Sequence, residues 1–334
     1  MLCLGIESTA HTFSCSIIDS NKKDMILSEV RDIYKAPAGW GINPKDASKH
    51  HARNAPKILK KCLDDSSVDI KNIDLISYSA GPGLGPCLRI GAVMARSLSS
   101  FFNIPLIPVN HAIGHIELGI KLASLNNPLT LLVSGGHNMI LVFHKNRWRI
   151  FGETLDITIG QLFDQVGRNM GFSSPCGGKI EELSNLSDKR YLHPLPYVIK
   201  GNDVSFSGLL TAVKKIIRKK EYDLPEICFS LEETAFSIIV EAVERALSFT
   251  EKKEFLVVGG VSANNRLSHM LKMACDYHGA IFKSCPLRFC GDNGTQIAWT
   301  GLQAYMNSKA SIVDPEKAFI SQSWRLDSVD IEWR

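Results

Sequence analysis

Two pairs of short apolar segments, each around a turn of small residues, stand out along the chain. Residues 2–7 and 12–18 are rich in Leu, Ile, Phe and Ser and flank the turn at 8–11, a pattern that predicts a β-hairpin. The segment 129–143 repeats this pattern around a Gly-containing turn. Two such hairpins indicate a duplicated architecture, although the two halves differ too much in sequence to show a repeat.

Segments with helical periodicity alternate with short strands between and after the hairpins. Helices are expected at 46–63, 89–102, 159–170, 232–249, 265–278 and 295–305, and strands at 74–79 and 254–258. This alternation is typical of the mixed α/β class. The connections at 173–178 and 191–197 have turn or loop composition and lack the length of a flexible linker. We therefore expect two lobes packed around a cleft, where ligands usually bind.

The composition fits a two-lobed globular enzyme. The chain has 334 residues, 45% hydrophobic and 22% charged, which favours a folded, soluble protein. Its formal net charge of +4 permits an anionic partner but is below that of a dedicated nucleic-acid binder. Nine cysteines without a CxxC pair indicate reduced core residues. No signal peptide or membrane span is recognisable, so we expect a cytoplasmic protein without membrane contact.

His111 and His115 stand four residues apart, which places both imidazoles on the same face of a helix and lets them bind one metal ion. The spacing is that of a zincin, but Ala112 occupies the position of the general-base glutamate. Asp292, in a Gly-flanked turn before a helix, is the best distant third ligand. From the residues alone the alternatives stay open, because histidines also pack or cap helices and an acidic residue there is often an N-cap.

Several small-residue turns are candidates for binding phosphate through backbone N–H groups. Ser8 and Thr9 lie in the first hairpin turn, residues 134–136 lie in the second, and residues 259–264 open a helix after a buried strand. Each also fits a plain turn. The segment 81–86 follows neither the GxGxxG nor the Walker A pattern, which favours a structural or substrate-facing turn.

Charged residues on helices add weaker candidates. Asp164 and Glu181 lie on or beside helices that follow the second hairpin, where a carboxylate can accept ribose hydroxyls or remain a solvated charge. A basic run reads most simply as a solvated helix end, and RNA contact is the alternative. It consists of Lys214, Lys215, Arg218, Lys219 and Lys220.

Taken together, these motifs resemble one family, the tRNA threonylcarbamoyladenosine transferases, called TsaD in bacteria and the catalytic subunit of the KEOPS complex in archaea and eukaryotes. The likeness is to an archaeal-type member and covers nearly the whole chain. The matching motifs lie in order at 5–9, 51–53, 81–91, 111–115, 133–137, 152–156, 163–164, 205–209, 259–264 and 292–294.

The resemblance implies a fold and a site. The fold would be the duplicated α/β architecture of actin, Hsp70 and sugar kinases, with one lobe from 1–127 plus 295–334 and the other from 128–294. Iron or zinc would be bound by the catalytic residues His111, His115 and Asp292. The adenine nucleotide would contact Leu132, Val133, Ser134, Gly135, Gly136, Asp164, Gly177, Glu181 and Asn264. Several archaeal relatives have a metal-reaching tyrosine at position 132, so the metal shell is expected to be more open here.

The implied reaction transfers threonylcarbamoyl from threonylcarbamoyl-AMP to the N6 amine of the adenosine 3′ to the anticodon, in tRNAs that read ANN codons. Because the acyl group arrives activated, no side-chain nucleophile is expected. The implied partners are tRNA and the KEOPS subunits, which include a small atypical kinase and a small dimerisation subunit. Three other functions remain open at this point: an ATP-binding scaffold subunit without its own catalysis, a metallopeptidase and a small-molecule kinase.

Overall fold

The structure is a computed structural model that describes residues 1–188, 193–308 and 311–334. Its first half is built around a five-stranded sheet in the order β3-β2-β1-β4-β5. The strands are β1 (Leu2–Glu7), β2 (Thr12–Asp19), β3 (Ile26–Ile33), β4 (Leu75–Gly81) and β5 (Leu106–Asn110). Strands β1 and β2 are antiparallel and form the expected first hairpin, whereas β4 and β5 run parallel to β1.

Alternating side chains of this sheet pack against helices on opposite faces. Leu4 and Ile6 face the core formed with α1 (Pro44–Ser66) and α2 (Gly85–Phe102). Cys3 faces the other way, toward α10 (Gly294–Asn307). The period of two in a fully buried strand therefore places a helix layer on each side of the sheet.

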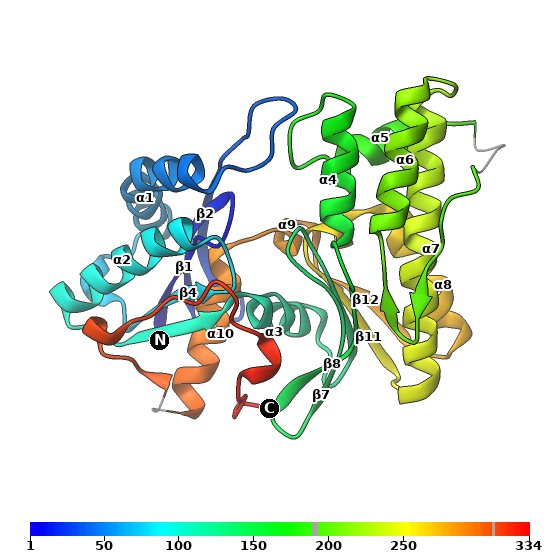
Figure 1. Ribbon diagram of the computed structural model, residues 1–334. Helices are drawn as coiled ribbons and strands as arrows, with labels where there is room; N and C mark the ends of the chain where they lie inside the picture. The colour runs from blue at the N-terminus through cyan, green and yellow to red at the C-terminus, as the bar shows by residue number, and fades with distance from the viewer. Residues whose placement is uncertain (189–192, 309–310) are drawn as a thin grey trace.

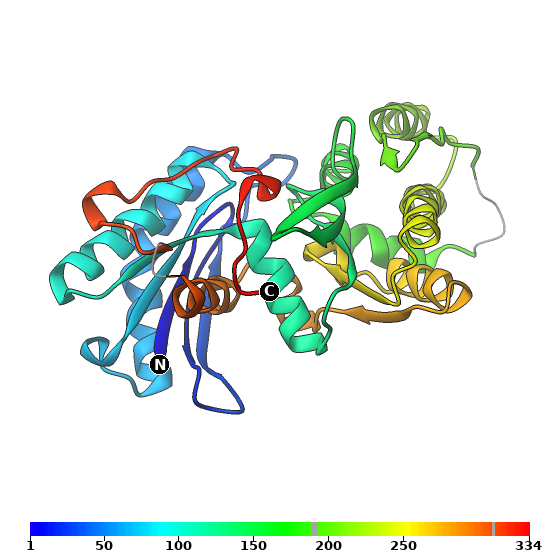
Figure 2. The same cartoon turned by 90° about the horizontal axis from the view of Figure 1, so that it is seen from below.

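The second half repeats this plan. Its sheet, read as β8-β7-β6-β11-β12, has the same strand order as the first, with an antiparallel hairpin followed by parallel strands. The strands are β6 (Leu129–Val133), β7 (Asn138–His144), β8 (Arg147–Glu153), β11 (Glu254–Val258) and β12 (Ile281–Ser284). The duplication that the two hairpins predict is thus confirmed, and Figures 1 and 2 show the two sheets side by side, each with its own helices.

One face of the second sheet is covered by a group of helices whose apolar sides form the larger core with β6 and β11. These helices are α4 (Ile159–Asn169), α5 (Gly177–Leu186), α6 (Ser207–Lys219), α7 (Leu224–Thr250) and α8 (Asn265–Tyr277). The opposite face packs on α3 (His111–Ala123), which lies centrally in Figure 1. The smaller elements are a short ladder of β9 (Ile199–Lys200) and β10 (Asp203–Val204) and the four-residue α9 (Leu287–Cys290).

Element boundaries differ from the expectation where Pro and Gly occur in a first helical turn. Helix α2 begins at Gly85 instead of 89, and α7 begins at Leu224 instead of 232. Each has a proline in its first turn, where the missing N–H costs nothing. Gly177 and Gly178 belong to α5, so the expected turn at 173–178 ends early. Part of the expected loop at 191–197 lies outside the described residues, and 193–197 contain no helix or strand.

All nine cysteines are free and buried, as the absence of paired motifs predicts. Burial raises the pKa of Cys275 to about 12, which keeps its thiol protonated. Among the helices in the described part of the chain, none combines the length and apolar composition needed to cross a lipid bilayer.

Candidate metal centre and nucleotide site

His111 and His115 occupy the first two turns of α3, because Asn110 starts the helix directly before them. The Asn110 side chain accepts hydrogen bonds from the backbone N–H groups of Ala112 and Ile113, at 3.0 and 3.3 Å. Both histidines are buried, and their ring centroids lie 4.7 Å apart on one face of the helix. The expectation that the four-residue spacing brings both imidazoles together is confirmed.

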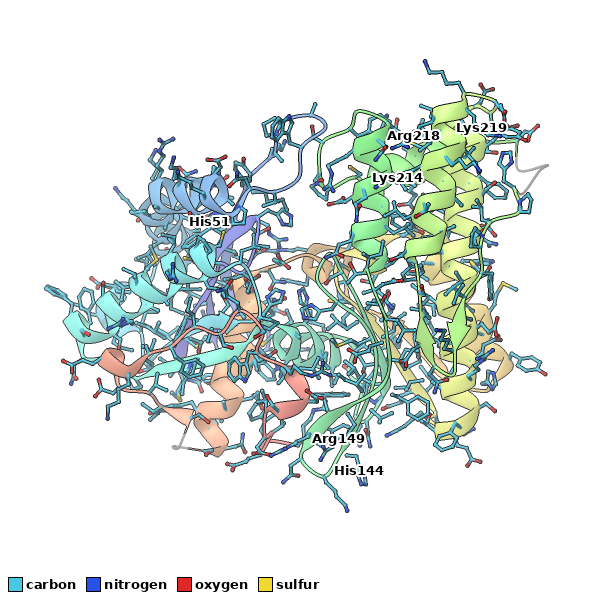
Figure 3. All side chains as sticks on the ribbon, in the orientation of Figure 1. His51, His144, Arg149, Lys214, Arg218 and Lys219 are labelled. Atoms are coloured by element: carbon cyan, nitrogen blue, oxygen red, sulfur yellow. The ribbon has the colours of Figure 1, made fainter. Side chains whose placement is uncertain are left out.

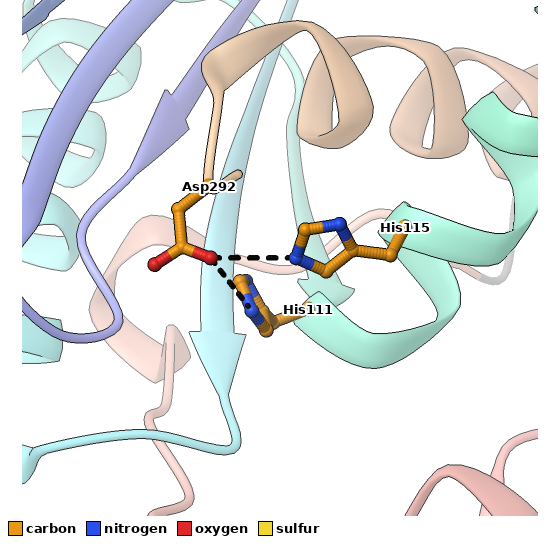
Figure 4. Close-up of side chains that lie close together, drawn as sticks. All are labelled: His111, His115 and Asp292. Carbon is orange, nitrogen blue, oxygen red and sulfur yellow. Dashed lines mark hydrogen bonds and ion pairs between the residues drawn. The ribbon is translucent and has the colours of Figure 1, made fainter. Parts of the chain in front are cut away.

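Asp292 completes the cluster from the loop before α10. Its Oδ1 lies 3.3 Å from His115 Nε2 and 3.5 Å from His111 Nε2, as the dashed lines in Figure 4 show. One potential ligand atom from each of the three residues lies within 4.8 Å of the others. The N-cap of α10 is Asn293, so the alternative role of Asp292 as a helix cap is wrong.

Close backbone packing fixes the position of Asp292. The start of α10 rests on β1, where a Cβ at Gly5 would lie 2.2 Å from the carbonyl oxygen of Gly294. Only glycines permit this approach. The loop that carries Asp292 is thereby held over the end of β1, close to α3.

Glu7 orients the first histidine. Its Oε2 lies 2.9 Å from His111 Nδ1, while its Oε1 accepts the N–H of Thr9 at 2.6 Å. A carboxylate at Nδ1 holds the proton on that nitrogen and turns Nε2, the nitrogen that would bind a metal, toward Asp292. Burial by itself lowers the pKa of His111, but Glu7 and Asp292 together raise it to about 9. The sequence interpretation missed Glu7, which stands 104 residues from His111.

The donor set suits a transition metal. Two imidazoles and one carboxylate are ligands of Zn²⁺ and non-haem iron, and three protein ligands leave coordination positions for a substrate. Burial raises the pKa of Asp292, but its hydrogen bond to His115 and the nearby His111 lower it overall, so the carboxylate is ionised. At position 132 the leucine side chain is fully buried and offers no ligand atom.

The second hairpin turn lies next to this cluster through His137. The His137 and His111 rings are stacked, with centroids 6.3 Å apart. Burial, followed by the charges of His111 and His115, lowers the pKa of His137 to about 3, so its ring is neutral. The sequence interpretation included His137 in a motif but gave it no role.

The turn at 134–136 is exposed and held by hydrogen bonds of its own. The Ser134 hydroxyl accepts the N–H groups of Gly136 and His137 at 3.2 and 3.0 Å, which makes the turn rigid. Gly135 and Gly136 are exposed, and a Cβ added to either meets nothing within 4 Å. The side chains of Leu132 and Val133 are fully buried in the core, so only their backbone can reach a ligand.

The first hairpin turn lacks the free N–H groups expected there. The N–H of Ser8 donates to the Ser79 hydroxyl at 3.0 Å, and that of Thr9 donates to Glu7. The Thr9 carbonyl accepts the N–H of Leu84 at 2.7 Å. Because these N–H groups already have acceptors, the expected role of this turn in phosphate binding is wrong. The segment 81–86 is a structural turn that holds the first hairpin turn through Leu84.

The remaining nucleotide candidates surround the starts of α5 and α8. Asp164 accepts the N–H of Cys176 at 2.6 Å, directly before Gly177. Glu181 accepts the N–H of Asn265 at 2.9 Å and so ties α5 to α8. Asn264 caps α8 by accepting the N–H of Leu267 at 3.0 Å. Each of these polar side chains holds a helix start, whose N–H groups favour anions.

Sheet pairing brings the two phosphate-binding candidates to one edge. Val258 pairs with Leu132 in the parallel ladder of β11 and β6, so the segments that follow both strands leave the sheet at the same end. Gly259, with φ of 96°, approaches so closely that a Cβ there would lie 2.3 Å from the Val133 carbonyl oxygen. The turn at 134–136 and the start of α8 therefore share the carboxyl edge of the sheet.

Glu232 supports this edge from α7 and was not identified from the sequence. It is 2% exposed, and its Oε1 accepts a hydrogen bond from Asn264 Nδ2 at 2.8 Å. Burial raises the pKa of Glu232 to about 7, with smaller contributions from Glu181 and Glu233. A partly protonated carboxyl group thus lies directly behind a predicted nucleotide contact.

Comparisons with known proteins identify the family. The family model described as TsaD, tRNA N6-adenosine threonylcarbamoyltransferase, matches residues 25–299. The chain is 44% identical to the protein of that name from Pyrobaculum islandicum, covering 100% of this chain and 98% of the relative. It is 45% identical to the one from Staphylothermus marinus, with 99% of each chain covered. A third relative, from Methanobrevibacter smithii, is named a probable bifunctional tRNA threonylcarbamoyladenosine biosynthesis protein; it is 44% identical, covering 100% of this chain and 60% of the relative.

Solved structures resemble the fold. Full-length HypF in a phosphate- and nucleotide-bound form matches 93% of this chain and 47% of its own length, with a TM-score of 0.60 at 11% identity. The activator of 2-hydroxyisocaproyl-CoA dehydratase from Clostridium difficile, solved with ADPNP, matches 94% of this chain and 99% of its own length, with a TM-score of 0.54 at 8% identity. At such identities the likeness concerns the fold alone, which is the duplicated α/β architecture that the sequence predicts.

Proposed function

The chain belongs to the tRNA N6-adenosine threonylcarbamoyltransferase family, and from this premise we propose that it transfers threonylcarbamoyl from threonylcarbamoyl-AMP to tRNA. The acceptor is the N6 amine of the adenosine 3′ to the anticodon, in tRNAs that read ANN codons. The metal is iron or zinc, bound by His111, His115 and Asp292. The observation that supports this most strongly is the contact of that cluster, through the His111 ring, with the hairpin turn at 134–137.

The adenylate binds along the carboxyl edge of the second sheet. The exposed turn at Gly135 and Gly136 faces the phosphate, and its donor is the N–H of Gly135, because the N–H of Gly136 already donates to the Ser134 hydroxyl at 3.2 Å. Asp164 and Glu181 take the ribose hydroxyls, and the starts of α5 and α8 at Gly177 and Asn264 complete the site. Leu132 and Val133 contribute backbone only, because their side chains are buried.

The reaction needs no nucleophilic side chain. The N6 nitrogen forms a bond to the carbamoyl carbon, the bond from that carbon to the phosphate oxygen breaks, the electron pair leaves with AMP, and the N6 proton passes to solvent. A bound metal would supply Lewis-acid polarisation of the carbamoyl carbonyl. The chain itself orients the reactants: Glu7 holds His111, and the rigid turn at Ser134 holds the phosphate end.

The tRNA has a basic surface available on α6. Figure 3 labels Lys214, Arg218 and Lys219 along this helix, and Arg218 and Lys219 lie exposed in its last turn. Exposed cations can contact phosphates of an RNA backbone without sequence preference. These side chains form the helix end that the sequence predicts, and we assign the tRNA backbone to them as part of the proposal.

The proposal extends to domains and partners. The lobes are formed by 1–127 with 295–334 and by 128–294, each containing one of the two sheets. The protein acts in the cytoplasm within a KEOPS complex, with a small atypical kinase and a small dimerisation subunit. The archaeal relatives support this, as does the bifunctional relative from Methanobrevibacter smithii, which is longer than this chain.

Reconstitution tests the function. The protein, its partner subunits, synthetic threonylcarbamoyl-AMP and an ANN-decoding tRNA are incubated, and modified adenosine is measured by mass spectrometry of nucleosides. Transfer by the wild type, and none by the variant with His111, His115 and Asp292 all changed to Ala, is expected. Equal transfer by both proteins, with partner subunits added, would identify a scaffold. Ala112 at the general-base position argues against a peptidase.

A further inference from the structure

His137 joins the turn at 134–137 to the metal-ligand cluster. Its backbone is held on both sides, since its N–H donates to the Ser134 hydroxyl at 3.0 Å and its carbonyl accepts the Ser134 N–H at 2.8 Å. Its ring is stacked on His111 at a tilt of 29°. The orientation of this imidazole is therefore set by the turn and by a neighbouring ring.

The ring itself has no hydrogen-bond partner within the described part of the chain. Its Nδ1 is buried and unpartnered, and its Nε2 makes no hydrogen bond with the described residues while the ring remains half-buried. Buried polar groups in folded proteins are nearly always paired, and Nε2, which is not buried, is the nitrogen of this ring that a ligand can reach. A rigid, unpaired imidazole beside two binding elements indicates a ligand group as its missing partner.

We propose that the His137 imidazole donates a hydrogen bond to the bridging phosphate oxygen of the adenylate, the atom that leaves with AMP. This inference rests on the proposed function. In the mixed anhydride, one oxygen joins the phosphate to the carbamoyl carbon. The phosphate end belongs to the turn that His137 closes, and the carbamoyl end belongs to the cluster containing His111, on which His137 is stacked.

The chemical role follows from the charge that develops during transfer. As N6 bonds to the carbamoyl carbon, the carbon–oxygen bond breaks, and both of its electrons remain on the phosphate oxygen. A hydrogen-bond donor already aimed at that oxygen stabilises the transition state more than the ground state. His137 exchanges no proton in this step, since the N6 proton passes to solvent.

Two variants of His137 test the proposal. His137→Ala removes the donor, whereas His137→Gln places an amide N–H near the position of Nε2. In single-turnover transfer, His137→Ala is expected to be about 100-fold slower than the wild type, as for the loss of one donor to a developing oxyanion. His137→Gln is expected to recover to within about 10-fold of the wild-type rate. Bound metal, measured by elemental analysis, and the melting temperature should remain at wild-type values in both variants.

His144→Ala is the matched control, because His144 is exposed at the far end of β7, the strand that begins directly after His137; Figure 3 labels His144. It should react at the wild-type rate. Wild-type transfer by His137→Ala overturns the proposal, and so does metal loss in both His137 variants, which would make the residue part of the metal shell. A wild-type protein that modifies no adenosine refutes the proposed function, and the role of His137 with it.

Discussion

Replacing Glu232 by Gln is expected to stabilise the protein in a pH-dependent way. Burial holds the pKa of Glu232 at about 7, against an ordinary value of 4.5, because the charged form loses its hydration. A raised carboxyl pKa means that the folded state binds the proton more tightly than the unfolded state. Protonated Glu232 therefore makes its full contribution to the free energy of unfolding below pH 4.5, and this contribution is lost as the pH rises through about 7.

The magnitude follows from the difference between the two pKa values, which corresponds to about 3 kcal/mol. Glutamine stays neutral at every pH, and its side-chain oxygen can still accept the hydrogen bond from Asn264. Glu232→Gln should therefore match the wild type near pH 4.5 and exceed it by up to about 3 kcal/mol at pH 8. Because Asn264 still caps α8, nucleotide binding should change little.

Urea unfolding of both proteins at pH 4.5 and pH 8, followed by circular dichroism, measures the effect. The control is Glu233→Gln. Glu233 forms an ion pair with Arg266, so removing its charge should not stabilise the protein at pH 8. The reasoning is refuted if Glu232→Gln changes the free energy of unfolding equally at both pH values, or if the variant is less stable than the wild type at pH 8.

Two further predictions concern the frame of the metal cluster. Glu7→Gln weakens the contact that orients His111, so metal affinity, measured in competition with a coloured chelator, should fall about 10- to 100-fold. The melting temperature should be nearly unchanged. Unchanged metal affinity would show that Glu7 does not orient His111. Gly5→Ala forces a Cβ against Gly294 and should lower the free energy of unfolding, measured with urea, by about 2–3 kcal/mol. The Cβ of Gly136→Ala points into open space, so this variant should keep its stability but bind AMP more weakly in calorimetry. Equal stability losses in both glycine variants would contradict the packing argument.

The hairpins and the duplicated plan could be predicted because their strands are apolar on both faces. Strands β3, β5, β8 and β12 were not predicted; in β3 and β8, charged residues such as Glu29, Arg31 and Arg149 interrupt the apolar runs, and β5 and β12 are only five and four residues long. All four lie at a sheet edge, where one side of the strand has no neighbouring strand and polar residues are tolerated. Periodicity identifies the centre of a sheet more readily than its edges.

The metal-ligand residues could be predicted only in part from local patterns. The spacing of His111 and His115 determines their common face, but Asp292 was ambiguous until Asn293 proved to be the cap of α10. Glu7 and His137 could not be assigned a role, because each meets His111 only through the tertiary fold. Such contacts depend on how the sheets and α3 pack, which no local pattern encodes.

Metal dependence of the transfer tests the central claim most directly. Threonylcarbamoyl transfer to tRNA is measured in a single turnover with protein stripped of metal by a chelator, and again after iron or zinc is restored. The cluster of His111, His115 and Asp292 predicts that stripped protein loses at least about 100-fold in rate, that metal restores it, and that Asp292→Ala does not recover. Stripped protein that transfers as fast as the metal-bound form would contradict the account.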